Sequence, residues 1–192
     1  MNPTCVIIVT GPPCSGKTTL ARRLAQGMGI ALITKDDIKE ILFEHLGWKD
    51  RLWSKQLGDA SIALLYQFAE VMLQSNTSVI LESNFHPEQA SPKFMEFLNK
   101  YSLDFVEIQC TARRDVLIDR LKERAEKRMR HPGHNDAQYL QEFENLPLDI
   151  ASYRLYLNSS PIIVETTGSQ DVDVGALIIN IQQILMTGKI KN

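Results

Sequence analysis

GPPCSGKT, at residues 11–18, directly follows the strand-like run CVIIVT at residues 5–10. Four of its residues fit the pattern G-x-x-x-x-G-K-[ST] without a gap, and they are Gly11, Gly16, Lys17 and Thr18. The context is the one that this motif requires, because a buried strand is expected before it and a helical pattern follows it. We therefore predict a phosphate-binding loop here, in preference to a plain glycine turn between a strand and a helix.

The chemistry of this loop suits the triphosphate of ATP. Its glycines let successive backbone N–H groups face an anion, and the following helix adds its positive N-terminal end. Lys17 is expected to reach the β- and γ-phosphates, and the Thr18 hydroxyl to ligate Mg²⁺. We interpret Cys14 as a small space-filling residue, although a thiol near a helix N-terminus can be reactive. The expected nucleotide contacts are Gly11, Pro12, Pro13, Cys14, Ser15, Gly16, Lys17, Thr18 and Thr19.

Length and composition limit the architecture. A chain of 192 residues with 44% hydrophobic content can bury one core and is short for two, so we expect a single domain over residues 1–192. The formal net charge of -2 gives no sign of a dedicated nucleic-acid binder, for which a strong basic excess is usual. Three widely separated cysteines favour a reducing compartment, and we find no secretory signal or membrane span. We expect a cytoplasmic protein without membrane contacts.

Short apolar runs alternate with longer segments of helical period. Such alternation predicts an α/β fold with a five-stranded parallel sheet and helices on both faces. The expected strands cover residues 5–10, 30–34, 78–82, 104–110 and 161–165. Helices are expected after Lys17, after Asp37, and over residues 54–74, 87–100, 114–127, 139–157 and 172–185. The core-facing stripe predicted for the helix at 54–74 consists of Leu57, Ser61, Leu64, Leu65, Phe68, Val71 and Met72.

Two aspartates follow the second expected strand, in ITKDDIKE at residues 33–40. In an open parallel sheet, ligands bind at the carboxyl ends of the strands. Asp37, with Glu40 three residues later, resembles an acidic capping box, so we interpret it as a helix cap. Asp36 is then free to face the phosphates, where a carboxylate accepts the proton of an attacking hydroxyl or holds that hydroxyl in line. A neutral hydroxyl suits this carboxylate as the attacking group, whereas an attacking phosphate would be repelled.

An acidic residue and a basic helix complete the set of candidate site residues. Glu82 ends the third expected strand, where a carboxylate can hold Mg²⁺ directly or through its water shell; the alternative is a surface carboxylate at a strand end. Arg120, Arg124 and Arg128 repeat every four residues along one helix face. Their charge pattern alone is typical of a solvated, salt-bridged face. Beside a triphosphate we favour a lid, at about residues 120–137, that brings Arg124 and Arg128, or Arg130 nearby, to the γ-phosphate.

Five stretches in order give the chain its resemblance to a known group of enzymes: GPPCSGKT, KDD, LESNF, the basic segment at 120–130 and IIVETTG. The chain resembles the AAA-type ATP-binding kinases of the small P-loop group that includes polynucleotide 5′-hydroxyl kinase, chloramphenicol phosphotransferase and the zeta-toxin kinases. The resemblance implies the P-loop NTPase fold, ATP and Mg²⁺ as cofactors, and Asp36 as general base. It also implies an arginine at or near Arg124 on the transferred group, and an adenine site near Arg113 and the loop at 166–168 that contains Thr167.

These observations lead us to expect a kinase that transfers the γ-phosphate of ATP to a hydroxyl of a small molecule. Segment 45–59 carries Trp48, Arg51 and Trp53 and is expected to build the acceptor pocket, with its aromatic residues either stacking on the acceptor or filling the core under a loop. One alternative is a nucleic-acid end kinase, because residues 113–130 hold eight basic side chains against four acidic ones. The other is a nucleotide-binding ATPase or switch that has no acceptor.

Overall fold

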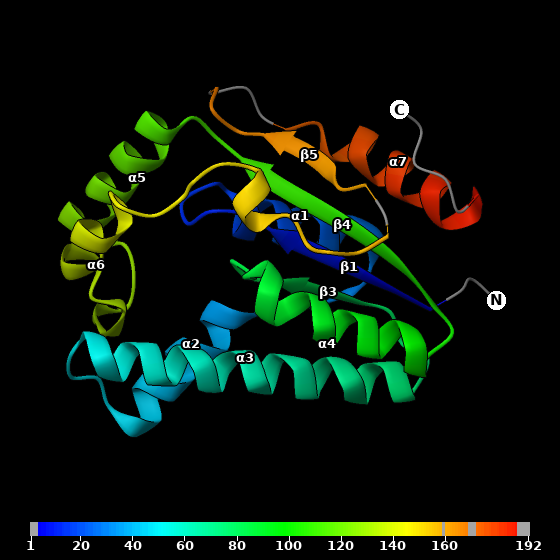
Figure 1. Cartoon of the computed structure of the whole chain (residues 1–192), viewed down its shortest axis with the longest axis horizontal. Helices are drawn as coiled ribbons and strands as arrows, with labels where there is room; N and C mark the ends of the chain where they lie inside the picture. Colours follow the sequence, from blue (N-terminus) through cyan, green and yellow to red (C-terminus); the bar gives the residue numbers. More distant parts are fainter. Residues whose placement is uncertain (1–3, 159, 169–171, 188–192) are drawn as a thin grey trace.

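The computed structural model describes residues 4–158, 160–168 and 172–187. Its centre is a five-stranded, all-parallel sheet with the strand order β2-β3-β1-β4-β5, covered by helices on both faces (Figure 1). The predicted fold class is confirmed, and each expected strand is present within a few residues of its predicted ends. The strands are β1 (Thr4–Thr10), β2 (Ala31–Thr34), β3 (Val79–Glu82), β4 (Leu103–Thr111) and β5 (Ile162–Glu165).

Seven α-helices lie within the described residues. They are α1 (Lys17–Met28), α2 (Lys35–Leu46), α3 (Arg51–Gln74), α4 (Pro87–Lys100), α5 (Arg114–Glu126), α6 (Asp136–Phe143) and α7 (Val174–Thr187). Helices α1 and α7 cover one face of the sheet, and α3 and α4 cover the other. Helices α5 and α6 pack on each other beyond the carboxyl end of β4, opposite α2 and the start of α3 (Figure 1).

Strand β1 shows why the sheet is buried on both sides. Its residues from Cys5 to Thr10 are all buried, and successive side chains point to opposite faces. Ile7 and Val9 join the core under α1 and α7, whereas Val6 and Ile8 join the core under α3 and α4. Because the central strand is held this firmly, the loop that follows it has a rigid base.

The helix predicted over residues 139–157 is wrong. Helix α6 ends at Phe143, and the remaining segment contains only a short 3₁₀ helix at Ala151–Tyr153. Pro147 lacks a backbone N–H and disfavours a helical conformation before it, which interrupts the pattern. Two buried side chains of β4 then hold the segment in an irregular conformation: the Gln109 side chain donates to the Ile150 carbonyl, and Glu107 accepts from the Leu155 N–H at 3.1 Å.

The helix predicted over 54–74 is present but begins earlier, at Arg51, where the Asp50 side chain caps it by accepting from the Trp53 N–H at 2.8 Å. The predicted core stripe is partly wrong, since Phe68 and Val71 are about half exposed. From Leu57 to Leu73 a buried residue recurs every four positions, so the buried face rotates slowly around the helix. Phe68 and Val71 are reached by steps of three residues and lie beside this face. Its buried residues are Ser54, Leu57, Gly58, Ser61, Leu65, Ala69 and Leu73.

The buried carboxyl of Glu107 makes the stability of the fold dependent on pH. Burial raises its pKa to about 7, against the smaller opposing effects of the Leu155 N–H and Arg154. Its contribution is therefore complete below the unfolded-state pKa of 4.5 and is lost as the pH rises through about 7. Glu107→Gln keeps the acceptor for Leu155 and should raise the melting temperature at pH 8 by roughly 5 °C.

Thermal unfolding at pH 5 and pH 8 checks this expectation, with the exposed Glu88→Gln as the matched control. The gain for Glu107→Gln should be small at pH 5 and large at pH 8, and the control should show no such trend. An equal effect of Glu107→Gln at both pH values would contradict the assigned titration.

Candidate active site

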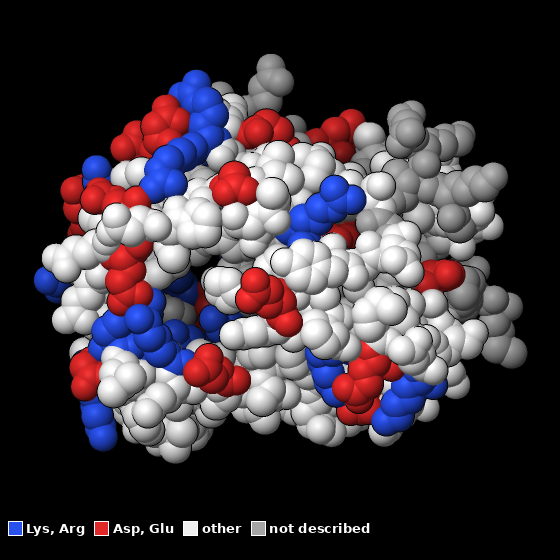
Figure 2. Space-filling model, in the orientation of Figure 1, with Lys and Arg blue, Asp and Glu red and all other residues white. Residues whose placement is uncertain are grey.

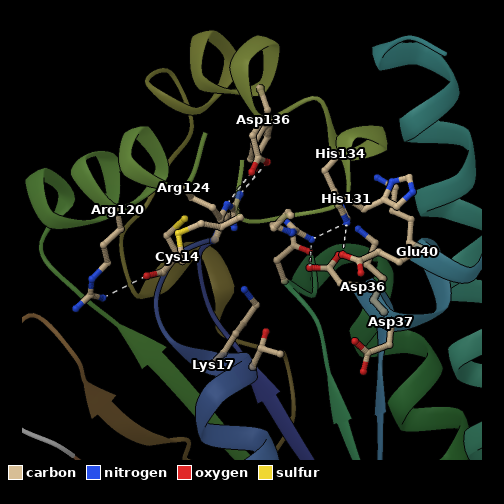
Figure 3. A pocket seen from close by; sticks show the side chains of 18 of the residues that line it. Cys14, Lys17, Asp36, Asp37, Glu40, Arg120, Arg124, His131, His134 and Asp136 are labelled. Atoms are coloured by element: carbon tan, nitrogen blue, oxygen red, sulfur yellow. Dashed lines mark hydrogen bonds and ion pairs between the residues drawn. The ribbon is translucent and has the colours of Figure 1, made fainter. Parts of the chain in front are cut away.

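One cavity of about 650 Å³ lies at the carboxyl ends of β1, β2 and β3. The phosphate loop forms its floor, the start of α2 forms one wall, and α5 with the loop before α6 covers it (Figure 3). Figure 2 shows a hollow between the α5–α6 pair and the α2–α3 pair, with Lys and Arg side chains gathered in it. The charged side chains that line the cavity are Lys17, Arg22, Lys35, Asp36, Asp37, Lys39, Glu40, Arg51, Arg120, Glu123, Arg124, Arg130 and Asp136.

The phosphate loop has the backbone geometry that its sequence requires. Gly11 has φ 136° and Gly16 has φ 78°, both in the region that favours glycine. A Cβ at Gly11 would also collide with the Cys110 carbonyl, so two independent constraints select glycine there. Lys17 opens α1, is largely buried, and donates to the Pro12 carbonyl at 3.3 Å across the loop. Burial raises the pKa of the Cys14 thiol, which agrees with a space-filling role.

Thr18 and Glu82 lie side by side next to the loop. The Thr18 hydroxyl donates to Glu82 Oε2 at 3.1 Å, and Lys17 Nζ lies 3.9 Å from Glu82 Oε1. Burial raises the pKa of Glu82, although Lys17 and Thr18 both act to lower it. A hydroxyl and a carboxylate oxygen are donors that Mg²⁺ prefers, so these two residues fit the magnesium ion that the sequence predicts.

The capping role predicted for Asp37 is wrong. Helix α2 begins at Lys35, three residues earlier than that role requires, and its cap is Thr34, whose hydroxyl accepts from the Asp37 N–H at 3.0 Å. The Asp37 side chain instead forms an exposed ion pair with Arg22 at 2.9 Å. Asp36 therefore lies in the first turn of α2, close to the end of β2.

The Asp36 carboxylate faces the cavity (Figure 3). Its Oδ2 lies 2.6 Å from a guanidinium nitrogen of Arg130, and 38% of its side chain is exposed. Burial alone would raise the pKa of Asp36, but Arg130, His134 and Lys35 outweigh it and hold the pKa well below the usual range. The group is thus fully ionised at neutral pH and paired with an arginine from the opposite wall.

The arginines expected on the lid are held in different ways. Arg124 lines the cavity and forms two hydrogen bonds with Asp136, at 2.8 and 3.0 Å. Arg120 donates to the Cys14 carbonyl at 3.2 Å and to Thr166, which ties α5 to the phosphate loop. Arg128 is exposed, has φ 49°, and lies outside the cavity lining. Arg130 reaches the cavity where Arg128 was expected.

The loop between α5 and α6 is docked on α2. His131 stacks on Phe43 with ring centroids 5.0 Å apart, and His134 contacts the same ring edge-on at 5.3 Å. Gly133 approaches this ring so closely that a Cβ there would lie 2.7 Å from it. His134 Nε2 also lies 2.9 Å from a Glu40 carboxylate oxygen. The part of the loop that directly follows Arg130 is therefore held against α2.

Other predicted residues lie at the margin of the site. The Arg113 N–H donates to the Thr167 hydroxyl at 2.7 Å, but neither residue lines the cavity, and the Arg113 side chain pairs with Asp115. In segment 45–59, Arg51 lines the cavity, whereas Trp48 is 49% exposed and contacts His131. Trp53 donates to the Gly47 carbonyl at 2.9 Å and also lies outside the lining.

Sequence reasoning missed Lys35 and Tyr139 as lining residues. A sequence signal existed for Lys35, because it immediately precedes Asp36 at the end of a predicted strand. Lys39 follows one turn later on the same helix and lines the cavity beside Lys35. The Tyr139 ring lies against Arg51, whose guanidinium carbon is 4.6 Å from the ring centroid. The two residues are distant in the sequence, so no local pattern reveals this contact.

Solved structures that resemble this chain contain kinases of the P-loop fold. The structure of "a putative kinase" from Chloroflexus aurantiacus J-10-fl is 33% identical with a TM-score of 0.82, and the alignment covers 95% of this chain and 98% of that one. The Mycobacterium tuberculosis APS kinase CysC, solved with AMPPNP and APS, is 13% identical with a TM-score of 0.57, and the alignment covers 97% of this chain and 99% of that one. This likeness shows a shared fold.

Among the described residues, no helix is both long and apolar enough to cross a membrane.

Curated relatives with similar sequence include an uncharacterized protein of Mycobacterium tuberculosis (strain ATCC 25618 / H37Rv), 31% identical over 125 residues. That match covers 62% of this chain and only 25% of the relative, so the matched region spans about a quarter of the curated protein's length. Residues 6–146 match the model of AAA_33, described as an AAA domain. This match contains the phosphate loop, Asp36, Glu82 and the arginines of α5, and the chain therefore belongs to the AAA_33 family.

Proposed function

We propose that this protein is an ATP-dependent kinase that transfers the γ-phosphate to a hydroxyl group of a small molecule. One observation carries the proposal: a single cavity is lined by Lys17 of the phosphate loop, on its floor, and by the ionised carboxylate of Asp36, on one wall. Hydrolases and switches need the first of these groups, but a carboxylate opposite the phosphates is suited to a hydroxyl acceptor.

The phosphate loop and the lid would hold and polarise the triphosphate. The backbone N–H groups of the loop and Lys17 bind the β- and γ-phosphates, and the positive end of α1 adds to their field. Mg²⁺, held by Thr18 with Glu82, would neutralise charge between the β- and γ-phosphates. Arg124 comes from the opposite wall and stabilises charge on the equatorial oxygens of the transferred group. Asp136 orients Arg124 through the two hydrogen bonds between them.

Asp36 would orient the attacking hydroxyl. Its lowered pKa makes it a weak base, so it accepts a hydrogen bond from the alcohol first. The proton moves to the carboxylate late, as the alcohol oxygen bonds to phosphorus and its own acidity increases. The ADP leaving oxygen departs on the opposite side, and the product is a phosphate monoester.

Arg130 must release Asp36 before this hydroxyl can bind. The 2.6 Å ion pair occupies the carboxylate, and the γ-phosphate is a competing partner for the same guanidinium. We therefore propose that ATP binds first and draws Arg130 away from Asp36. Because the loop that carries Arg130 is docked on Phe43, this exchange requires only a side-chain movement.

A transfer assay with γ-labelled ATP tests the proposal. Small alcohols, sugars and 5′-hydroxyl oligonucleotides are offered separately, and the labelled products are identified, with Asp36→Asn as control. Label in a small organic phosphate that depends on Asp36 is the expected result. Label on oligonucleotides alone would identify a nucleic-acid end kinase. Label in free phosphate, at a rate that no alcohol changes, would mean an ATPase or switch and would overturn the proposal.

A further inference from the structure

Two lysines in the cavity have no carboxylate partner. Lys39 is only 5% exposed, and its ammonium group donates to the Ser54 hydroxyl at 2.9 Å. Lys35, one turn earlier on α2, also lines the cavity. Within the described part of the chain, neither lysine has a carboxylate oxygen within 4.0 Å. A buried ammonium without a counter-ion is costly, so its presence calls for an explanation.

Other cations of the same cavity are paired. Arg124 pairs with Asp136, Arg130 with Asp36, and Arg51 with Glu142 at 3.0 Å. Lys17 Nζ lies 3.9 Å from Glu82 Oε1, and as the lysine of the phosphate loop it is expected to bind the phosphates of ATP. Arg120 has no carboxylate partner either, but it donates to the backbone carbonyls of Cys14 and Thr166. Among the described lining residues, Lys35 and Lys39 are thus the cations that no hydrogen bond or ion pair joins to a carboxylate or a carbonyl oxygen.

The two ammonium groups lie together at the junction of α2 and α3. A Cβ built on Gly58 of α3 would lie 3.6 Å from Lys39 Nζ and 3.7 Å from Lys35 Nζ. Asp36 lies between the two lysines in the sequence and faces the same cavity. Lys35 also opens α2, so the positive end of this helix adds to their field. A negative charge is favoured here, at the end of the cavity where the acceptor is expected.

We propose that the acceptor is an anionic alcohol, whose phosphate or carboxylate group binds Lys35 and Lys39 while its hydroxyl reaches Asp36. This inference rests on the proposed kinase function and specifies its substrate class. Because Lys39 is already buried and Lys35 is partly buried in the folded protein, an incoming anion gains strong electrostatic attraction. A neutral alcohol of the same shape leaves both lysines without a counter-ion and binds poorly.

The protonation of these lysines supports the same site. Burial, with the neighbouring Lys35, lowers the pKa of Lys39 to about 7, against the opposing effect of Asp36. Burial also lowers the pKa of Lys35, against the opposing effects of Asp36 and of Asp59. A lowered lysine pKa means that the charged form is disfavoured in the folded state, so this group adds stability as the pH rises from about 7 towards 10.5. Binding of an anion would reverse the shift, and acceptor binding near pH 8 should therefore take up protons.

Matched acceptor pairs test the proposal: alcohols are compared with analogues that carry a phosphate or a carboxylate, such as a sugar with its phosphate and its sugar acid. The wild-type protein should prefer the anionic member by about 100-fold or more in kcat/KM. Lys39→Met and Lys35→Met should each reduce this preference strongly, whereas Lys100→Met, which removes an exposed lysine of α4 outside the cavity, should keep it. An unchanged preference in both cavity variants would overturn the proposal.

A binding measurement separates this proposal from the kinase function itself. Inorganic sulfate is titrated against the protein with the phosphate loop saturated by a non-hydrolysable ATP analogue, and thermal stabilisation is recorded. Sulfate should stabilise wild type and Lys100→Met and lose its effect in Lys35→Met and Lys39→Met, whose melting temperatures without sulfate report folding. Retained anion binding without transfer to any alcohol would support the subsite and overturn the kinase function. Transfer to neutral and anionic alcohols alike, with no sulfate effect, would overturn the subsite alone.

Discussion

Replacing Asp36 with asparagine is expected to lower the rate of phosphoryl transfer by about 100-fold or more while ATP affinity stays nearly unchanged. The amide keeps the size of the side chain but cannot accept the hydroxyl proton. The amide also forms no ion pair with Arg130, which leaves this arginine free to bind the γ-phosphate. A lower transfer rate would therefore come from the missing carboxylate and not from a trapped Arg130. Single-turnover transfer rates and ATP binding by calorimetry, measured on the same preparation, give the two quantities.

Asp37→Asn is the matched comparison, because Asp37 is the next residue on α2 and its carboxylate makes an exposed pair with Arg22. Its transfer rate should stay close to that of wild type. If Asp36→Asn lost ATP affinity and transfer rate in equal proportion, Asp36 would be a structural or nucleotide-binding residue. If neither quantity changed, the hydroxyl would be oriented by another group.

Arg124→Met is expected to lower transfer by about 1,000-fold, with a smaller effect on ATP affinity. Its guanidinium is the one that Asp136 holds with two hydrogen bonds on the cavity wall. Arg124→Lys should restore little, because a lysine cannot form the same planar pair of bonds with phosphate oxygens. Added guanidinium ions should partly rescue Arg124→Met, as measured by single-turnover transfer.

The Arg124–Asp136 pair also contributes to the packing of α5 on α6, and a second variant separates the two roles. Asp136→Asn removes the partner and leaves the arginine in place. We expect it to lose less activity than Arg124→Met. Equal losses in the two variants, together with no rescue by guanidinium, would show that Arg124 acts by holding the helices together and not on the transferred phosphate.

The parts of this site that depend on local sequence were predictable. The phosphate loop is read from contiguous residues, and Asp36 and Glu82 follow from the rule that parallel strands end at the same edge of the sheet. These groups line or adjoin the cavity because the strand order brings β3 between β1 and β2. The fold class followed from the same alternation of strands and helices.

The parts that failed depend on where helices end and on contacts between distant segments. Arg128 was placed by continuing the helical repeat of α5, but that helix ends at Glu126 and the chain turns at Arg128, so Arg130 enters the cavity instead. Lys35 and Lys39 acquire their unusual environment from Ser54 and Gly58 of α3. No repeat within one segment of the sequence encodes that contact.

A crystal structure with a non-hydrolysable ATP analogue and Mg²⁺ tests the central claim most directly, namely that Asp36 faces the γ-phosphate across the cavity. The account predicts the β- and γ-phosphates on Lys17, Arg130 turned away from Asp36, and space for a hydroxyl oxygen between the Asp36 carboxylate and the γ-phosphorus. A complex in which Arg130 still covers Asp36, or in which the γ-phosphate points away from that carboxylate, would contradict it.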